Sequence, residues 1–389
     1  MPACDYLSAV QVRSLQALFL EMSDLPSLRQ KIDSLDTTLV NLLNERARVS
    51  LDIGAAKRQM ETVDPSQSEE KEPHVYMPAR EKQVYEKLNR LNRGPLKDDS
   101  LNAIFREIMS ASISLQQNVS VAYLGPPGTF SHQAAYERFG DSVAYVPQKQ
   151  ITAVFEAVEK GRTTYGLVPF ENSTYGSVIE TMDYLMHTDV QIRAETYLTV
   201  HQCLLSNSKL EDIKKIYSHP QGLGQVQEWL KANCPHAERV PVKSTAEAAQ
   251  LAAVETGAAA ICSEICASLY GLNVVAQDIE DIKTNTTRFL ILGTSSDNPT
   301  KCDHTLIRFT VDHRQPGALC DGLKVFKVHN LNLSKIDSRP SRQRPWHYVF
   351  FVECSGHAKD DNVKQAVKEM EQYCLDVFVL GSYPDQRPE

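Results

Sequence analysis

A heptad pattern of apolar residues near the N-terminus constrains the fold of this chain more than any other feature. Leu28, Leu35, Leu42, Val49 and Ala56 recur every seven residues, with further apolar residues between them. The spacing predicts one helix of about 36 residues, roughly 54 Å long at about 1.5 Å per residue, with an apolar seam along one side. Because a single helix cannot bury such a seam, the pattern predicts partner helices along its whole length.

Two cations share one face of this helix. Arg46 occupies a seam position that should be apolar, and Lys57 follows 11 residues later. A lone arginine in a seam more often snorkels to solvent or pairs with an acid, but 11 residues at about 100° each bring Lys57 within about 20° of Arg46. Arg29 lies 17 residues before Arg46, about 25 Å along the axis and about 100° around it. One straight helix cannot present all three to one small ligand, whereas two antiparallel copies could, so the geometry predicts a dimer with a pocket that mixes chains.

The residue pattern changes twice after this helix. A polar loop over 61–73 precedes two further helices, about 78–92 and 98–117. Short β-type runs then alternate with helical segments such as 221–233, which is the pattern of an α/β module. A β-α-β-β-α-β order follows and ends in a strand over 375–380, which is typical of a ferredoxin-like fold. The expected divisions are an N-terminal extension, an all-α module, a two-lobed α/β module and an α+β module, at residues 1–24, 25–117, 118–295 and 303–381.

The charge balance and the cysteines exclude several classes of function. The 389 residues include 41 Lys and Arg against 49 Asp and Glu, a net charge of −8, whereas a dedicated nucleic-acid binder usually has a basic excess. No apolar run approaches the roughly 18–20 residues of a membrane span. The nine cysteines are scattered without zinc-ligand spacing, which predicts no metal site and a reducing compartment. Because the first residues lack a targeting pattern, we expect a cytoplasmic protein.

Short polar motifs recur along the helical module. They are Leu28–Asp33, Asn44–Arg46, Gly54–Lys57, Ala79–Glu81 and Ser112–Gln117. Together they resemble the all-helical chorismate mutases over residues 25–117. The resemblance implies a domain-swapped dimer, with Arg29 reaching in from the other chain. The substrate-binding residues that it implies are Arg29, Arg46, Lys57, Arg80, Glu81, Ser112 and Gln116.

The chemistry of chorismate rearrangement suits this residue set. The reaction is pericyclic and needs no nucleophile, base or cofactor, but the dianion must be held compact while charge develops on its ether oxygen. Arginines grip carboxylates, and Lys57 with Gln116 forms the expected catalytic donor pair at that oxygen. Met77 stands where family members usually carry an Asp. It can serve if the position contributes its backbone N–H, whereas activity falls if the family uses the carboxylate.

Four polar clusters lie at loop-to-element junctions of the second module. They are Gly125–Ser131, Pro169–Gly176, Ser218–Gln221 and Asn285–Phe289. Ligands bind at such strand ends and helix starts. In order and spacing these motifs resemble prephenate dehydratase across 119–293. The family fold implies two α/β lobes, like those of bacterial solute-binding proteins, with the site in the cleft.

This second resemblance assigns roles in the loss of carbon dioxide and hydroxide from prephenate. Thr287 is the expected donor to the leaving hydroxyl, and Arg288 is a carboxylate anchor or a local organiser. His219, before a proline, is more often structural. No metal or cofactor is required. The other catalytic candidates are Glu171, Asn172, Ser173 and Gln221, and the implied substrate contacts are Thr129, Phe130, Ser131, Asn172, Ser218, Gln221, Thr287 and Phe289.

The third module carries weaker signals at one helix start and one strand end. Gly317–Leu319 and Ile336–Pro340 resemble ACT regulatory domains, although Cys320 and Asp337 replace more usual residues. The resemblance implies phenylalanine binding at a dimer interface and feedback inhibition. The implied effector residues are Gly317, Ala318, Leu319, Asp337, Ser338 and Arg339.

The module order as a whole resembles the bifunctional chorismate mutase/prephenate dehydratases. The expected protein is therefore an isomerase and a lyase of phenylalanine biosynthesis that acts on chorismate and prephenate, responds to phenylalanine and forms a homodimer or higher oligomer. Two alternatives remain open at this point. One is an arogenate dehydratase with a weakened mutase, and the other is a non-catalytic amino-acid-binding regulator.

Overall fold

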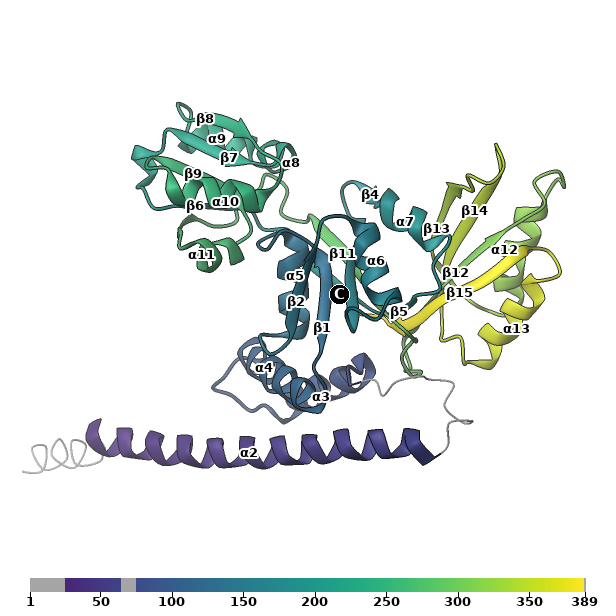
Figure 1. The fold of residues 1–389 in the computed structure, drawn as a ribbon, viewed down its shortest axis with the longest axis horizontal. Coiled ribbons are helices and arrows are strands. Elements are labelled where there is room, and N and C mark those ends of the chain that lie inside the picture. The colour runs from purple at the N-terminus through teal and green to yellow at the C-terminus, as the bar shows by residue number, and fades with distance from the viewer. Residues whose placement is uncertain (1–24, 64–74, 388–389) are drawn as a thin grey trace, which may run out of the picture.

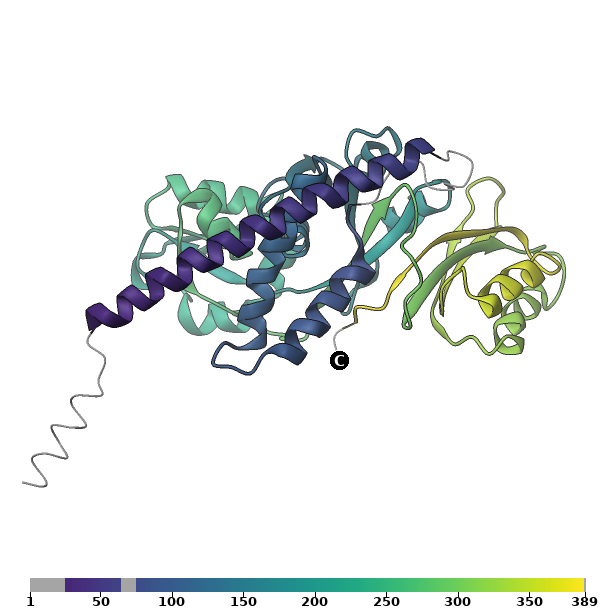
Figure 2. The same cartoon turned by 90° about the horizontal axis from the view of Figure 1, so that it is seen from below.

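The long N-terminal helix and two shorter ones form one end of the molecule. The computed structural model describes residues 25–63 and 75–387. Helix α2 (Leu25–Val63) confirms the predicted long helix, and α3 (Pro78–Leu91) and α4 (Asp98–Gln116) confirm the other two. The loop expected from residue 61 begins later because α2 continues to Val63, and 64–73 lie outside the described residues. Figures 1 and 2 show α2 as one straight rod that crosses α3 and α4.

Only part of the apolar seam is covered within one chain. Helix α2 packs on α4, but Leu28, Leu35 and Leu42 remain 42%, 67% and 57% exposed. The expectation of partners along the whole helix is therefore not met by this chain alone. A face of this kind is normally buried against another element.

The first lobe of the α/β module is a mixed sheet in the order β2-β1-β3-β11-β5, with β4 beside β3. Strand β11 returns between β3 and β5 and runs antiparallel to both. The chain therefore leaves this sheet after β5, builds the second lobe and comes back. The elements of the lobe are β1 (Ser120–Leu124), α5 (Phe130–Phe139), β2 (Ala144–Gln148), α6 (Ile151–Glu159), β3 (Tyr165–Asn172), β4 (Gly176–Ser177), α7 (Ile179–Leu185), β5 (Gln191–Thr199) and β11 (Thr286–Gly293).

The second lobe is a five-stranded sheet in the order β10-β6-β9-β7-β8. One helix was predicted over 221–233, and this is wrong: two short helices, α8 (Pro220–Gly224) and α9 (Gln227–Asn233), replace it. Gly222 and Gly224 lower the helix propensity there. The remaining elements are β6 (Cys203–Ser206), η1 (Leu210–Asp212), β7 (Lys215–Ser218), β8 (Glu238–Pro241), α10 (Thr245–Val254), β9 (Ala258–Cys262), α11 (Ile265–Tyr270) and β10 (Asn273–Ala276).

The C-terminal module confirms the β-α-β-β-α-β order. Its antiparallel sheet has the order β13-β14-β12-β15. The final strand was expected to end at residue 380 but continues to Pro384. The elements are β12 (Asp303–Thr310), α12 (Ala318–Val328), β13 (Leu333–Pro340), β14 (Tyr348–Ser355), α13 (Asp361–Met370) and β15 (Leu375–Pro384).

This module and the first lobe share one apolar core. Leu306, Phe351 and Leu380 belong to the same buried cluster as Val154 of α6. Strand β15 runs so close to β5 that a Cβ on Gly381 would lie 2.2 Å from the Ile192 carbonyl oxygen. The first lobe therefore lies between the second lobe and the C-terminal module (Figure 1).

Two further findings concern the described residues alone. None of their helices is long and apolar enough to cross a membrane. Their eight cysteines are free thiols, and Cys262 and Cys266 pack in the core of the second lobe.

Candidate active sites

A cavity of about 330 Å³ lies among α2, α3 and α4, and we refer to it as the helical cavity. Arg46 and Lys57 both line it, so the shared-face argument is confirmed. Arg29 does not line it and is exposed near the start of α2. The predicted residues that the fold brings together here are Arg46, Lys57, Arg80, Glu81, Ser112 and Gln116.

The polar groups of this cavity are held by short contacts. The guanidinium of Arg46 donates to the Ser112 hydroxyl and to the Ile108 carbonyl, at 3.4 Å for the carbonyl. The Gln116 amide nitrogen donates to the Ser112 carbonyl at 3.2 Å. The Gln116 amide oxygen is buried without a hydrogen-bond partner among the described atoms. The polar side chains of the cavity are therefore held in place by hydrogen bonds, and the rest of its lining is apolar.

Desolvation lowers the pKa of the two α2 cations that line the helical cavity. Burial lowers the pKa of Arg46, and burial with the charge of Arg193 lowers the pKa of Lys57. The Lys57 ammonium lies 3.9 Å from the Met77 sulfur, at the position where the resemblance leads us to expect an Asp. Met77 is the N-cap of α3 and accepts the Arg80 and Glu81 amides on its carbonyl. A bound dianion would restore the solvation that these cations lack.

A second cavity, of about 570 Å³, lies between the two lobes, and we refer to it as the cleft cavity. Seven predicted residues line it: Thr129, Phe130, Ser131, Asn172, Gln221, Thr287 and Phe289. No residue lines both the cleft cavity and the helical cavity in the part of the chain that the structure describes.

Strand register explains how the hydroxyl of Thr287 meets its neighbours. Thr287 pairs with Asn172 across β11 and β3. The Asn172 amide nitrogen donates to the Thr287 hydroxyl at 3.0 Å and to the Asn285 side-chain oxygen at 2.7 Å. With its oxygen accepting from Asn172, the Thr287 hydroxyl keeps its proton to donate into the cavity.

Four predicted residues of this site do not line the cleft cavity. Ser173 exchanges hydrogen bonds with Thr284 and Thr286, and the buried Ser218 hydroxyl donates to the Ile261 carbonyl at 2.7 Å. Both serines therefore bind backbone groups of neighbouring segments in this arrangement. Glu171 and Arg288 face the C-terminal module instead.

Arg288 is a buried hub between two modules. Its guanidinium lies 2.7 Å from the Glu195 carboxylate, contacts Glu353 of β14 and lies 3.4 Å from the Tyr383 hydroxyl. Burial alone would lower the pKa of Arg288, but Tyr383, Glu195 and Glu353 outweigh it and raise that pKa. Of the two expected roles, this geometry supports the local organiser.

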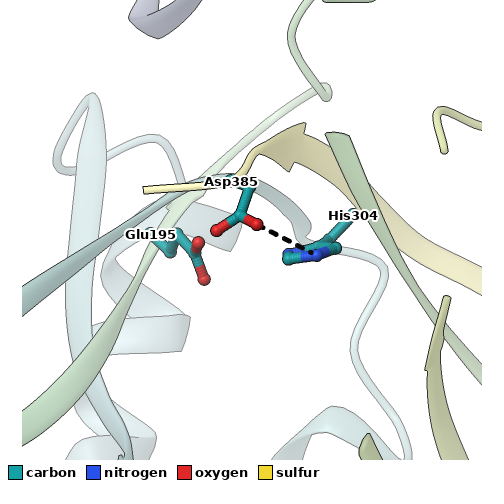
Figure 3. Close-up of side chains that lie close together, drawn as sticks. All are labelled: Glu195, His304 and Asp385. Carbon is teal, nitrogen blue, oxygen red and sulfur yellow. Dashed lines mark ion pairs between the residues drawn. The ribbon is translucent and has the colours of Figure 1, made fainter. Parts of the chain in front are cut away.

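Three acidic or imidazole side chains converge beside this hub. Glu195, His304 and Asp385 point toward one another, and His304 lies 3.4 Å from the Asp385 carboxylate (Figure 3). Each of the three has a guanidinium partner: Arg288 contacts Glu195, and Arg387 lies 2.7 Å from the His304 ring and 3.2 Å from the Asp385 carboxylate. The cluster is therefore a set of ion pairs that joins the first lobe to the C-terminal module.

Several lining residues of the cleft cavity were missed from the sequence. Lys243 and Ser244 lie at the start of α10, where Ser244 accepts from the Glu247 amide at 3.0 Å and Glu247 accepts from the Lys243 amide at 2.8 Å. Ser-Thr-Ala-Glu is a readable capping box, so a signal was present. Gln202 and Gln225 line the cavity too, but no motif marks them.

The effector candidates occupy two places. Gly317 is the N-cap of α12 with a left-handed φ of 86°, and Ala318 and Leu319 follow it into the module core. Asp337 and Arg339 on β13 contact the first lobe, where the Ser177 hydroxyl donates to Asp337 at 2.6 Å. Ser338 is exposed, and its amide donates to Asp337 at 2.8 Å. Arg339 bonds Asp183 at 2.7 Å.

Comparisons with known proteins identify the family. Residues 28–117 match the family "Chorismate mutase type II" and residues 121–297 match "Prephenate dehydratase". A bifunctional chorismate mutase/prephenate dehydratase of Aquifex aeolicus is 41% identical over 368 residues, which cover 93% of this chain and 98% of that one. This chain belongs to the bifunctional chorismate mutase/prephenate dehydratases. Its enzyme activities are accordingly the rearrangement of chorismate to prephenate and the conversion of prephenate to phenylpyruvate, in phenylalanine biosynthesis.

Two further relatives match a part of this bifunctional enzyme. An arogenate dehydratase/prephenate dehydratase of Arabidopsis thaliana is 36% identical over 291 residues, covering 71% of this chain and 75% of its own. The prephenate dehydratase of Arthrobacter aurescens, solved in complex with L-Phe, superposes with a TM-score of 0.64 at 31% identity, covering 70% of this chain and 92% of its own.

Proposed function

We propose that the bifunctional enzyme runs its two reactions in the two separate cavities. The helical cavity would take chorismate and the cleft cavity would take prephenate. The observation that carries this division is the grouping of six predicted residues around one cavity and seven around the other. The free state of the described cysteines supports a cytoplasmic location.

In the helical cavity, cations meet the two carboxylates of chorismate. Arg46 and Arg80 are the natural carboxylate partners because guanidinium groups bind such anions in pairs of hydrogen bonds. Lys57 and Gln116 would donate to the ether oxygen as negative charge develops on it, which is electrostatic stabilisation of the transition state. Holding the substrate compact supplies the rest of the acceleration.

A second copy of the chain would complete this cavity. Leu28, Leu35 and Leu42 leave an exposed apolar face on α2, and Arg29 lies about 25 Å along that helix from Arg46. An antiparallel α2 from a partner would cover the face and bring its own Arg29 to the cavity. The homodimer is therefore part of the proposal.

In the cleft cavity, Thr287 would donate its proton toward the leaving hydroxyl of prephenate. Its oxygen accepts from Asn172, which orients the hydroxyl and stabilises charge that forms on it. The starts of α5 and α10 face the cavity through Thr129 and Ser244, and Lys243 adds one ammonium. Amide dipoles and this cation suit two carboxylates. Gln221 would orient the ring.

The C-terminal module would act as the phenylalanine sensor, with an ACT-type site at Gly317–Leu319 and Asp337–Arg339. Support comes from the relative solved in complex with L-Phe. Lys335 of β13 bonds both the Glu171 carboxylate and the Ser177 hydroxyl at 2.8 Å, and Ser177 lines the cleft cavity. A shift of β13 on binding phenylalanine would reach that cavity directly.

Two substitutions separate the two cavities experimentally. Purified enzyme given chorismate is expected to form phenylpyruvate, followed by its ultraviolet absorbance in alkali. Lys57→Ala should abolish chorismate consumption and leave turnover of added prephenate intact, whereas Thr287→Ala should let prephenate accumulate. An arogenate dehydratase would instead turn over arogenate faster than prephenate. If Lys57→Ala consumed chorismate at the wild-type rate, the helical cavity would not be the mutase site.

A further inference from the structure

One carboxylate of the helical cavity is held by the dehydratase module. Glu81 on α3 lines the cavity, and its carboxylate lies 2.7 Å from the guanidinium of Arg138 on α5, with side chains only 12% and 11% exposed. The same guanidinium donates to the Tyr76 hydroxyl at 2.6 Å and lies over the Tyr76 ring at 5.2 Å. Arg138 therefore has its direction fixed by two partners, neither of which belongs to its own module.

We propose that Arg138 is a positioning residue for the mutase reaction and that the dehydratase module thereby completes the mutase site. The inference rests on the assignment of the helical cavity to chorismate, and it concerns a residue outside the mutase module. Helix α5 would serve both reactions, since its first residues, Phe130 and Ser131, line the cleft cavity and its last turn carries Arg138.

The start of α3 is fixed by the same module at further points. The Ala79 amide donates to the Asp297 carboxylate at 2.9 Å, which caps the helix. Arg193 of β5 donates to the Tyr76 carbonyl at 2.9 Å and lies 3.6 Å from Asp297. The segment that presents Glu81 is thus built against the first lobe rather than against α2, so removing Arg138 alone leaves the helix start anchored.

The charge of Glu81 depends on this arrangement. Burial raises the pKa of the Glu81 carboxyl, and Arg138 opposes that rise. For Arg138, burial lowers the pKa, but Glu81 and Tyr76 outweigh it and raise it. The titratable groups that face Glu81 from the packed elements are Tyr76, Tyr85, Arg138 and Asp297, and the cations of its cavity are Arg46, Lys57 and Arg80.

An ionised Glu81 has a use in the reaction. Chorismate carries a ring hydroxyl besides its two carboxylates, and a carboxylate is the strongest acceptor for a hydroxyl donor. Arg138 holds that acceptor charged and pointed into the cavity. Without Arg138, the pKa of the Glu81 carboxyl would rise further, because the cation that opposes the effect of burial would be gone.

The test uses the full-length enzyme and three substitutions of Arg138 and Glu81. Arg138→Gln is expected to lower mutase kcat about tenfold at pH 7, because a larger fraction of the Glu81 carboxyl is then protonated. The loss should shrink as the pH is raised, because the carboxyl ionises again. Arg138→Lys should restore most of the rate. Prephenate turnover should stay within about twofold of wild type, which shows that the dehydratase module is folded.

Three comparisons decide the outcome. Arg138→Gln should add no further loss to Glu81→Gln, as expected when one residue acts through the other. Arg106→Gln, at a partly buried arginine of α4 that pairs with Glu107 and does not line the helical cavity, is the matched control and should leave the mutase unchanged. A loss that is independent of pH and adds to that of Glu81→Gln would overturn the proposal, as would a wild-type rate for Arg138→Gln. Lys57→Ala is run beside them, because an active Lys57→Ala variant points to a wrong cavity rather than a wrong role for Arg138.

Discussion

Replacing Arg288 by Met tests whether the junction between the first lobe and the C-terminal module is held by buried charge. The guanidinium lies 2.7 Å from Glu195 and also contacts Glu353, and these carboxylates are 0% and 1% exposed. Met keeps much of the length and volume of the side chain but removes the cation. Two acidic groups are then left in the same buried space.

The expected loss of stability is large. Removing one partner of a buried ion pair costs about 3–5 kcal/mol, because the other charge stays uncompensated. At least one of the two carboxyls is expected to bind a proton in the folded variant, so its pKa rises above the unfolded value of about 4.3.

The sign of the pH dependence follows from that rise. A carboxyl with a raised folded-state pKa contributes stability that is present below the unfolded pKa and lost as the pH rises through the folded pKa. In the wild type, burial is outweighed by Arg288, Ser334 and His304 together, which lower the pKa of Glu353, so that contribution is instead lost as the pH falls. The difference between variant and wild type should therefore grow from about pH 5 to pH 8, by about 1.4 kcal/mol per pH unit for one proton.

Urea unfolding followed by circular dichroism at pH 5, 6, 7 and 8 measures this difference. Arg314→Met, at an 88% exposed arginine paired with Asp312, is the control and should change the free energy of unfolding by less than about 0.5 kcal/mol. Adding Glu195→Gln to Arg288→Met should recover part of the loss. A deficit below about 1 kcal/mol, or one that does not depend on pH, would refute the reasoning.

Three further outcomes are expected. Thr287→Val, which keeps the shape and removes the hydroxyl, should lower dehydratase kcat by about 10²–10⁴-fold and leave the mutase rate unchanged. Gly381→Ala should lower the free energy of unfolding by about 1–3 kcal/mol, because its Cβ would lie 2.2 Å from the Ile192 carbonyl oxygen; Gly224→Ala, with no atom within 4 Å, is the control in the same thermal melt. Lys335→Met removes the contacts to Glu171 and Ser177. It should raise the phenylalanine concentration for half-inhibition at least about fivefold. A titration of dehydratase activity with phenylalanine measures this concentration, with Lys359→Met as the control variant.

Local patterns predicted the elements well and their mutual placement poorly. Heptad spacing gave the length of α2 because periodicity is a property of one helix. The prediction of one continuous helix over 221–233 is wrong because the apolar spacing favours a helix there, whereas Gly222 and Gly224 disfavour one. The pairing of Glu81 with Arg138 joins two modules, so no spacing rule connects them.

The orientation of the Arg288 side chain follows from its place in the strand. Successive side chains of a strand point to opposite faces, so Thr287 and Phe289 in the cavity require Arg288 to face the other way. The resemblance assigned Arg288 to the site because it stands inside the motif. Strand alternation was the better guide to its side chain.

The separation of the two cavities has a consequence for the time course of the overall reaction. Within the described residues the two cavities share no lining side chain, so with one reaction in each cavity, as proposed, we expect prephenate to be released into solvent between the two steps. Enzyme mixed with chorismate should then show a lag before phenylpyruvate appears, while free prephenate builds up to its steady level. In a second experiment the chorismate carries an isotope label. Unlabelled prephenate added to the mixture should then lower the labelled fraction of the phenylpyruvate that forms.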